Sequence, residues 1–304
     1  MKIFVFALML LNLTTAYCAG VLDNPVNVQE IDLKNIDDIM ISYSSEKVTL
    51  IKNDSDSLVI KEYMSEDDRN YYTKIINSGN RLSIEAGRRP VSSLFKARIE
   101  IYIPVSDKNF TIKTSSGSIE GNDEYTASSV NMESSSGSIS VNSIIAKTVN
   151  FKASSGSIRC REVNGNISVH VSSGRIIIGS INGNISAEAS SGSIELKLIN
   201  GAADVKTSSG SIDCTFTENA GDISIMSSSG GVSLKLPMNF AFNFSSRTSS
   251  GRLQTPFSNK LFSPVSDRDS VQGVINGGST FENQNLKNIT IKTTSGSIRI
   301  NWNS

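Results

Sequence analysis

The sequence predicts an all-β protein, a single-domain parallel β-helix (β-solenoid) with about 18 residues in each turn and a cap at both ends. Three observations predict this fold. A serine-glycine corner occurs nine times, the corners follow one another at a nearly constant spacing, and apolar residues alternate with polar ones after each corner. Alternation with period two indicates strands with one buried face.

The corner has the form Ser-Ser-Gly in eight of the nine cases and Thr-Ser-Gly at Gly296, followed in most turns by Ser-Ile. Its glycines are the predicted structural corner residues: Gly117, Gly137, Gly156, Gly174, Gly192, Gly210, Gly230, Gly251 and Gly296. The first seven intervals are 20, 19, 18, 18, 18, 20 and 21 residues, and the last is 45 because an insertion interrupts the repeat. A weaker Asn-Gly corner follows nine residues after three of them, at Gly165, Gly183 and Gly201. One turn therefore contains two half-turns, each a strand.

The second residue after each strong-corner glycine is apolar, which predicts an inward column. Its members are Ile119, Ile139, Ile158, Ile176, Ile194, Ile212, Val232, Leu253 and Ile298. Parallel stacking places each of these residues about 4.8 Å from its equivalent in the next turn. Glycine at the corner permits a positive φ or a close approach of the backbone. We expect the neighbouring serine hydroxyls to bond to backbone groups at the bend.

The same columns predict two reduced and buried cysteines. Cys160 and Cys214 both lie four residues after a corner glycine and are three turns apart, with Ile178 and Leu196 between them. Three turns span about 14 Å, beyond the Cα–Cα limit of about 7 Å for a disulfide.

Residues 1–20 are expected to form a signal peptide, because Lys2 precedes a short apolar run and then small residues. Lipidation at Cys18 is an alternative, although the residues before it fit a lipoprotein signal poorly. No later segment is apolar enough for a transmembrane helix.

Residues 21–97 should supply capping strands and the first turns, and residues 98–304 the regular repeats. The segment 256–288 is expected to be a loop insertion or flap, and Trp302 to cover the last turn.

The repeated "SSGSI…NGNI", the internal "LKLPMNFAFNF" and the closing "GGSTFENQNLKNITIKTTSGSIRINW" resemble a bacterial family of putative adhesins with β-strand repeats, whose domain has no known function. The resemblance extends from about residue 35 to the end of the chain. It implies a β-helical fold in exported or envelope-associated proteins. The family has no defined catalytic residues to transfer.

The residues themselves predict no catalytic, cofactor or metal site. His170 is the single histidine and is expected at an outward, solvated position, where it lacks the partners of a triad or a metal site. Glu195 and Asp213 lie on adjacent turns of one outward column, with Arg159 two turns before Glu195 and Ile177 between them. Such columns act as acids and bases in β-helix enzymes on acidic polysaccharides, so a polysaccharide lyase or hydrolase is the alternative function.

We therefore predict a non-catalytic exported protein of the cell envelope, periplasmic or at the cell surface. It would act as an adhesin or binding scaffold for an envelope, surface or polysaccharide ligand. The 29 basic and 29 acidic residues balance and form no long run of one charge, which argues against nucleic acid as a partner. A regular array of serine hydroxyls could also match a repeating lattice such as ice or a crystalline polysaccharide. The competing interpretation is a corner that satisfies its own backbone.

Overall fold

The computed structural model describes residues 23–258, 262–264, 270–276 and 286–303. The expected signal peptide and Cys18 lie outside this part of the chain. The protein is an all-β solenoid, as the sequence predicts, and the only helical segment among the described residues is the short 3₁₀-helix η1 (Arg69–Tyr71). The chain divides into two compact units, Met1–Ile144 (unit 1) and Ile145–Ser304 (unit 2).

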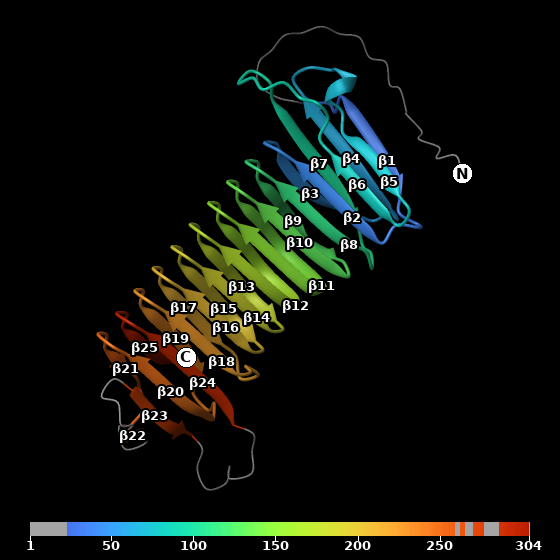
Figure 1. Ribbon diagram of the computed structural model, residues 1–304. Coiled ribbons are helices and arrows are strands. Elements are labelled where there is room, and N and C mark those ends of the chain that lie inside the picture. The colour runs from blue at the N-terminus through green and yellow to red at the C-terminus, as the bar shows by residue number, and fades with distance from the viewer. Residues whose placement is uncertain (1–22, 259–261, 265–269, 277–285, 304) are drawn as a thin grey trace. The chain divides into compact units, whose positions relative to one another are not determined.

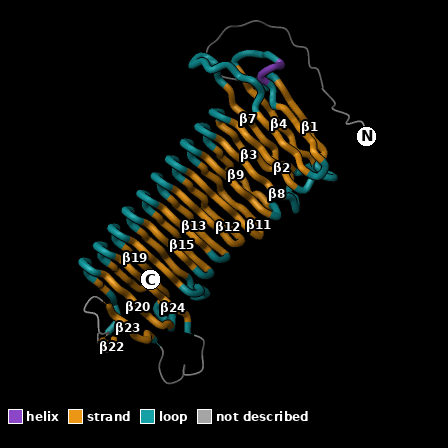
Figure 2. The backbone as a smooth tube through the Cα atoms, in the orientation of Figure 1, coloured by secondary structure: helices purple, strands orange, loops and turns teal. Residues whose placement is uncertain are grey.

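Unit 2 is a stack of parallel turns, each made of two strands (Figures 1 and 2). On its first face, the strands that follow the strong corners pair in the order β13 (Ile176–Asn182), β15 (Ile194–Asn200), β17 (Ile212–Phe216) and β19 (Val232–Pro237). On its second face, the order is β14 (Ile185–Ala189), β16 (Ala203–Thr207) and β18 (Ile223–Ser227). The strand β12 (Ile158–Val171) is long enough to pair with β13 on one face and with β14 on the other.

The core of unit 2 is built from columns of identical or similar residues. Ile176 pairs in register with Ile194, and Ile194 with Ile212, and each of these side chains is at most 1 % exposed. A neighbouring column runs in register from Cys160 through Ile178 and Leu196 to Cys214. Both cysteines are free and buried, which confirms the column predicted from their spacing.

The strong-corner glycine is required by a close approach of the backbone and not by a positive φ. Among the described glycines, a positive φ occurs at Gly79, Gly165 and Gly183. A Cβ atom on Gly192 would overlap the carbonyl oxygen of Gly174 in the preceding turn, and a Cβ on Gly210 would overlap that of Gly192. The structure thus decides between the two roles that the sequence left open.

The corner serines bond to the preceding turn through their backbone. Ser190 N donates to Val171 O at 3.1 Å, and Ser191 N donates to Ser172 O at 2.9 Å, so the ladder continues around the bend. The hydroxyl that bonds to the corner belongs to the residue three before the glycine: Thr207 Oγ1 donates to Gly192 O and accepts from Gly210 N. Serine hydroxyls bond to the backbone of the bend in several turns, as expected: Ser227 Oγ donates to Gly230 O, and Ser157 Oγ and Ser297 Oγ accept from Arg175 N and Arg252 N. The side chains of the two serines directly before most corner glycines are exposed.

The last turn in sequence is not the last turn of unit 2. The strand β24 (Lys287–Thr293) pairs with β18 on one side and with β20 (Phe242–Thr248) on the other. Likewise β25 (Ile298–Asn303) lies between β19 and β21 (Leu253–Gln254). The sequence suggested that Trp302 covers the final turn. Because Trp302 lies on β25, it belongs instead to the turn before the final one. Its ring packs against Phe257, with the centroids 5.1 Å apart.

The described part of residues 256–288, expected to be a loop, contains two whole strands and the first two residues of β24. The strand β23 (Ser270–Ile275) pairs antiparallel with β20, and β22 (Phe262–Pro264) pairs antiparallel with β23. Without β23, β20 would present an unpaired edge, and such edges favour aggregation.

Unit 1 uses the same arrangement near the start of the chain. The strand β2 (Asp38–Tyr43) lies between β6 (Arg81–Glu85) and β8 (Asn109–Thr114), in parallel with both. The strand β3 (Lys47–Asn53) lies between β7 (Ala97–Pro104) and β9 (Ile119–Thr126). The stack then continues with β10 (Ser129–Ser134), which is parallel to β8, and with β11 (Ile139–Ala153), which crosses the division between the units.

Three antiparallel strands complete unit 1. The strand β5 (Lys74–Ser78) pairs with β6, β4 (Ser57–Met64) pairs with β7, and β1 (Asn27–Asp32) pairs with β4. These strands cover edges that the parallel turns would leave open.

Candidate functional site

The outward acids of the first face lie on adjacent turns, as their spacing predicts. Glu195 and Asp213 pair in register on β15 and β17, and Ile177 pairs with both Arg159 and Glu195. The Glu195 carboxylate forms a salt bridge with the ammonium group of Lys197, at 2.7 Å. A surface pair of this kind is a solvated contact and does not by itself make an acid–base site.

His170 lies on the second face, with its imidazole 41 % exposed. Its Nδ1 atom is 3.5 Å from Glu188 Oε2 on the adjacent turn. Within the described residues, no group of three or more His, Cys, Asp or Glu side chains could hold a metal ion.

The two cysteines lie in the apolar interior. Burial raises the pKa of the Cys160 thiol to about 12, and it also raises the pKa of Cys214. A thiol of high pKa is a poor nucleophile and a poor metal ligand, so the chemistry of these residues is that of packing.

The weak corner carries a ladder of asparagine side chains that the sequence reading missed. Asn182 Nδ2 donates to Asn164 Oδ1 at 2.7 Å, and Asn200 Nδ2 donates to Asn182 Oδ1 at 3.1 Å. The Asn-Gly pairs at 164–165, 182–183 and 200–201 supply these amides at the same position of successive turns. The recurrence of asparagine at Asn164, Asn182 and Asn200 was the feature of the sequence that could have predicted the ladder.

A second ladder follows the corner glycine and bonds to the backbone. Asn166 Oδ1 accepts from Asn184 N at 3.0 Å, and Asn184 Oδ1 accepts from Ala202 N at 2.9 Å. Two turns further on, Asp222 Oδ1 accepts from Asn288 N at 2.8 Å. Since the backbone occupies the amide oxygens, the Nδ2 groups of the exposed Asn166 and Asn184 remain as hydrogen-bond donors.

These side chains line an open groove of about 660 Å³ in unit 2, which we call the amide groove. It crosses successive turns of the second face, and a column of short polar residues runs beside the asparagines: Ser168, Ser186, Asp204, Ser224 and Thr290. Its only charged lining residues are Asp204 and Asp222. The groove therefore offers neutral donors and acceptors that recur at equivalent positions of the turns containing Asn166 and Asn184, with Ala202 and the two aspartates in the turns that follow.

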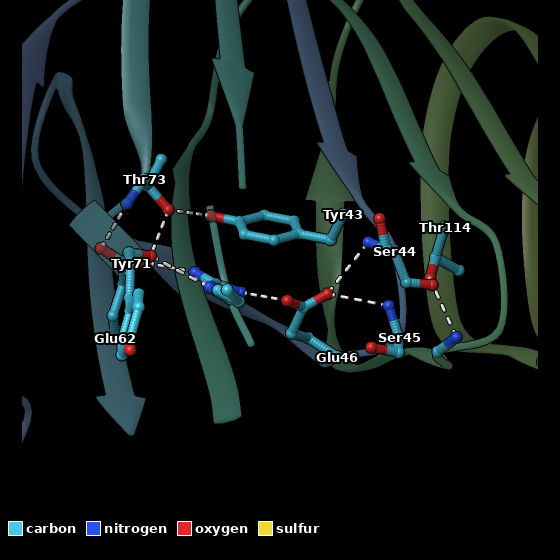
Figure 3. A network of polar contacts seen from close by, with 10 residues as sticks. Tyr43, Ser44, Ser45, Glu46, Glu62, Tyr71, Thr73 and Thr114 are labelled. Carbon is cyan, nitrogen blue, oxygen red and sulfur yellow. Dashed lines mark hydrogen bonds and ion pairs between the residues drawn. The ribbon is translucent and has the colours of Figure 1, made fainter. Parts of the chain in front are cut away.

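A buried ionic network in unit 1 was also missed (Figure 3). Arg89 forms ion pairs with Glu46 and, at 2.5 Å, with Glu62, and all three side chains are at most 7 % exposed. Thr73 donates to Glu62 through both its backbone nitrogen and its hydroxyl, and the hydroxyl group of Thr73 also bonds to Tyr43.

The sequence signal for this network was the stretch "YSSEKV". The registers align Tyr43 with Thr114 and Val48 with Ile119, so Glu46 occupies the position of the corner glycine. Its carboxylate accepts from Ser44 N and Ser45 N, both at 2.9 Å. Burial acts to raise the pKa of Glu46, but the charge of Arg89 and these hydrogen bonds outweigh it, so the pKa lies below its ordinary value. The network joins the corner at Glu46, the capping strand β4 and the segment between β6 and β7 that contains Arg89. Its role is therefore structural.

The chain matches the family described as Toastrack DUF4097 over residues 36–301. The chain belongs to this family. The match confirms the resemblance seen in the repeats. It is a single match that covers most of unit 1 and of unit 2.

Solved structures similar to this Toastrack chain share little sequence with it. A putative lipid binding protein from Parabacteroides distasonis is 15 % identical, with a TM-score of 0.48, 92 % of this chain covered and 97 % of that one. A putative adhesin from Bacteroides fragilis is 12 % identical, with a TM-score of 0.46 and coverage of 90 % and 96 %. A putative cell adhesion protein from Clostridium sporogenes is 11 % identical, with a TM-score of 0.32 and coverage of 91 % and 98 %.

No curated protein matches the Toastrack chain at the sequence level. In the part of the chain that the structure describes, no helix is long and apolar enough to cross a membrane.

Proposed function

We propose that this Toastrack protein is a non-catalytic, exported binding scaffold of the cell envelope, and that its amide groove binds an extended, uncharged polar polymer such as a polysaccharide. The observation that carries the proposal is the repetition of the groove lining. Asn166 and Asn184 present the same amide donors one turn apart, with Ser168 and Ser186 beside them. A polymer with a repeating unit can meet such a surface in register, at about 4.8 Å per turn.

Several features support a scaffold over a reactive site. The asparagines are held by the backbone of the neighbouring turn, so their positions are fixed before a ligand arrives. Preorganised donors reduce the entropy lost on binding. Hydrogen bonds spread over many turns also suit a long ligand, whose affinity is the sum of many weak contacts.

The test is binding of the purified protein to an array of neutral polysaccharides. Ser186→Tyr places a bulky side chain in the groove and leaves the asparagine ladder intact, and Ser233→Tyr is the matched change on the first face. We expect Ser186→Tyr to weaken binding about tenfold or more and Ser233→Tyr to leave it unchanged. Equal binding by both variants and the unmodified protein would reject the groove as the site.

The alternative function, a polysaccharide lyase or hydrolase, is favoured by one observation, the adjacent carboxylates of Glu195 and Asp213. We predict that Glu195→Ala with Asp213→Ala changes neither polysaccharide binding nor the size distribution of the bound polymer. The measurement is size-exclusion chromatography of the polymer after long incubation. Chain shortening that the double variant abolishes would establish the enzyme.

The proposed location, periplasm or cell surface, is tested separately by protease treatment of intact cells. Digestion of the protein while a periplasmic control stays intact would place it at the cell surface. Protection until the outer envelope is opened would place it in the periplasm and exclude adhesion to external surfaces.

A further inference from the structure

The amide groove is adjoined by a second hollow at the end of unit 2, which we call the end groove. It has a volume of about 360 Å³ and is lined by residues of β20, β23 and β24 (Figure 1). Asn288 and Thr290 on β24 line both grooves, so the two are continuous along the second face. None of the described residues that line the end groove is charged.

Two rows of outward side chains form the walls of this continuous trough. The column of short polar residues that reaches Thr290 in the amide groove continues in register to Ser245 and then to Gln272. The asparagine row continues beside it, because Asn243 pairs in register with Asn288. Asn243 Nδ2 donates to Asn288 Oδ1 at 3.2 Å. The pattern of amides and hydroxyls in the amide groove therefore extends into the end groove.

The spacing of the strands gives the dimensions of the trough. Its walls are two residues apart on each strand, as Asn243 and Ser245 are on either side of Phe244, which corresponds to about 6.6 Å. The strands cross it in the order β12, β14, β16, β18, β24, β20 and β23. At about 4.8 Å for each step between strands, its length is about 29 Å. A trough of this width and length holds one extended chain, whereas a crystalline lattice needs a flat face.

The last residues of the trough come from the strand that interrupts the repeat. The antiparallel strand β23 places Gln272 opposite Ser245 and Val274 opposite Asn243. Gln272 is exposed, and its amide supplies both donors and an acceptor. Val274 is 43 % exposed and adds an apolar contact beside it. The insertion thus adds a position with its own chemistry to the end of the trough.

We propose that the amide groove and the end groove form one site for a single neutral polysaccharide chain, which runs along the stack from β12 to β23 and meets Gln272 at its end. The inference rests on the proposed function and adds to it the direction and length of the bound chain and a residue that selects it. A neutral chain is favoured because the charged residues of the trough are both acidic, Asp204 and Asp222. They would repel the acidic groups of an anionic polymer.

A polysaccharide is favoured over an extended peptide because the trough crosses the strands. Peptides that bind to sheets as added strands use the unpaired backbone groups of an edge. The strands under the trough are already paired on both sides: Ile223 of β18 pairs in register with Ala203 and with Ile289. The trough therefore offers a ligand mainly amide and hydroxyl side chains, which match the hydroxyl groups of sugars.

The test combines substitutions along the trough with ligands of different length. Ser245→Tyr fills the end groove, Ser186→Tyr fills the amide groove, and Ser233→Tyr is the control on the first face. Gln272→Ala removes the last amide, and its control is Gln254→Ala, an exposed residue on the first face. The probe is size-fractionated glucomannan, a linear, neutral and water-soluble polysaccharide. Each tyrosine in the trough leaves five neighbouring strands open, so the fractions are chosen with lengths below about 19 Å and above about 29 Å.

With the long fractions, we expect Ser245→Tyr and Ser186→Tyr each to lose about tenfold in affinity and Ser233→Tyr to stay within about twofold of the unmodified protein. Gln272→Ala should lose about threefold, the effect of one hydrogen bond, and Gln254→Ala should lose nothing. With the short fractions, both tyrosine variants should bind within about twofold of the unmodified protein, because each leaves room for a short chain. Circular dichroism checks that every variant is folded.

The outcomes separate this inference from the proposed function. A loss for Ser186→Tyr, with none for Ser245→Tyr and Gln272→Ala, would overturn the inference and leave the proposed function standing. Equal losses with short and long chains would also overturn it, as would equally strong competition by a neutral Gly-Ser polypeptide, which would assign the trough to peptides. If glucomannan does not bind, the size series is prepared from a neutral polysaccharide whose binding Ser186→Tyr weakens. The absence of any such polysaccharide would overturn both proposals.

Discussion

At the scale of single residues, the need for glycine at the corner comes from the neighbouring turn. Gly230 and Gly231 are adjacent in sequence but differ in this respect. A Cβ on Gly230 would overlap the carbonyl oxygen of Gly210, whereas the nearest atom to a Cβ on Gly231 is Ser297 O at 3.7 Å. Only the first of the two glycines is needed by the packing.

We predict that Gly230→Ala lowers the free energy of unfolding by about 3 kcal/mol, because backbone of two turns must move apart. Gly231→Ala should change it by less than about 1 kcal/mol and can stabilise by restricting the unfolded chain. Urea denaturation followed by circular dichroism measures both. Similar losses for the two variants would show that the conformation of the glycines, and not the close approach, matters.

The ionic network of unit 1 makes a prediction about pH. The pKa of Glu46 in the folded protein is lowered, so its contribution to stability is complete above the unfolded pKa of about 4.3 and is lost as the pH falls through the folded pKa. Arg89→Met leaves two buried carboxylates unpaired and should cost about 3–5 kcal/mol at pH 7. In that variant the charge of Arg89 no longer opposes the effect of burial, which raises the pKa of Glu46, so acidification from pH 7 to 5 should restore stability.

Urea midpoints measured between pH 7 and 3 test this prediction. The control is Arg81→Met, since the Arg81 side chain is 64 % exposed and should contribute little to stability. If the stability of the Arg89 variant and that of the unmodified protein depend on pH in the same way, the ion pairs of Arg89 do not stabilise the folded state.

At the scale of elements, the turn formed by β24 and β25 holds the end of unit 2 together. Ile291 on β24 is fully buried and pairs in register with Ile225 of β18 and Ser246 of β20. An unpaired charge at this position would be buried between two turns. The C-terminal strands are therefore as central to packing as the middle of the repeat.

We predict that Ile291→Asp destabilises unit 2 by more than about 4 kcal/mol, whereas Thr290→Asp, on the outward side of the same strand, changes stability by less than about 1 kcal/mol. Hydrogen exchange should show lost protection in β18 and β20 for the first variant only. Retained protection of β20 in Ile291→Asp would show that its pairing with β24 is not required.

The sequence predicted the repeated turns well because each turn depends on its own residues. The spacing of corner glycines and the alternation around Ile194 determine both strands and register, and the positions of Cys160 and Cys214 follow from them. The order of the end turns does not depend on local residues. The sequence of β24 alone does not show whether this strand stacks after β20 or, as observed, lies between β18 and β20.

The missed polar features have a similar cause. Glu46 replaces a corner glycine in a turn whose adjoining segment, between β6 and β7, supplies Arg89. That segment is distant in sequence, so the stretch "YSSEKV" could be recognised as a corner only after the registers were known. The asparagine ladders depend on side chains of equivalent positions meeting across turns, which the repeat contains but a strand prediction does not use.

At the scale of the whole molecule, each unit protects the edges of its stack with antiparallel strands. In unit 2 this is β23, which pairs with β20 opposite β24. Phe242 and Phe244 on β20 are buried, so uncovering this edge would expose apolar surface together with unpaired backbone groups. An open edge of this kind pairs with other chains.

We predict that Val271→Pro with Gln272→Pro converts the protein to larger species. In an antiparallel pair the donors alternate, so one of two consecutive prolines removes a ladder hydrogen bond with β20, and both rings distort the strand. The measurement is sedimentation velocity, with the unmodified protein and Val91→Pro, in the exposed segment between β6 and β7, as controls. A sedimentation coefficient equal to that of the controls would show that β20 stays protected without β23, and the capping role of the insertion would then be wrong.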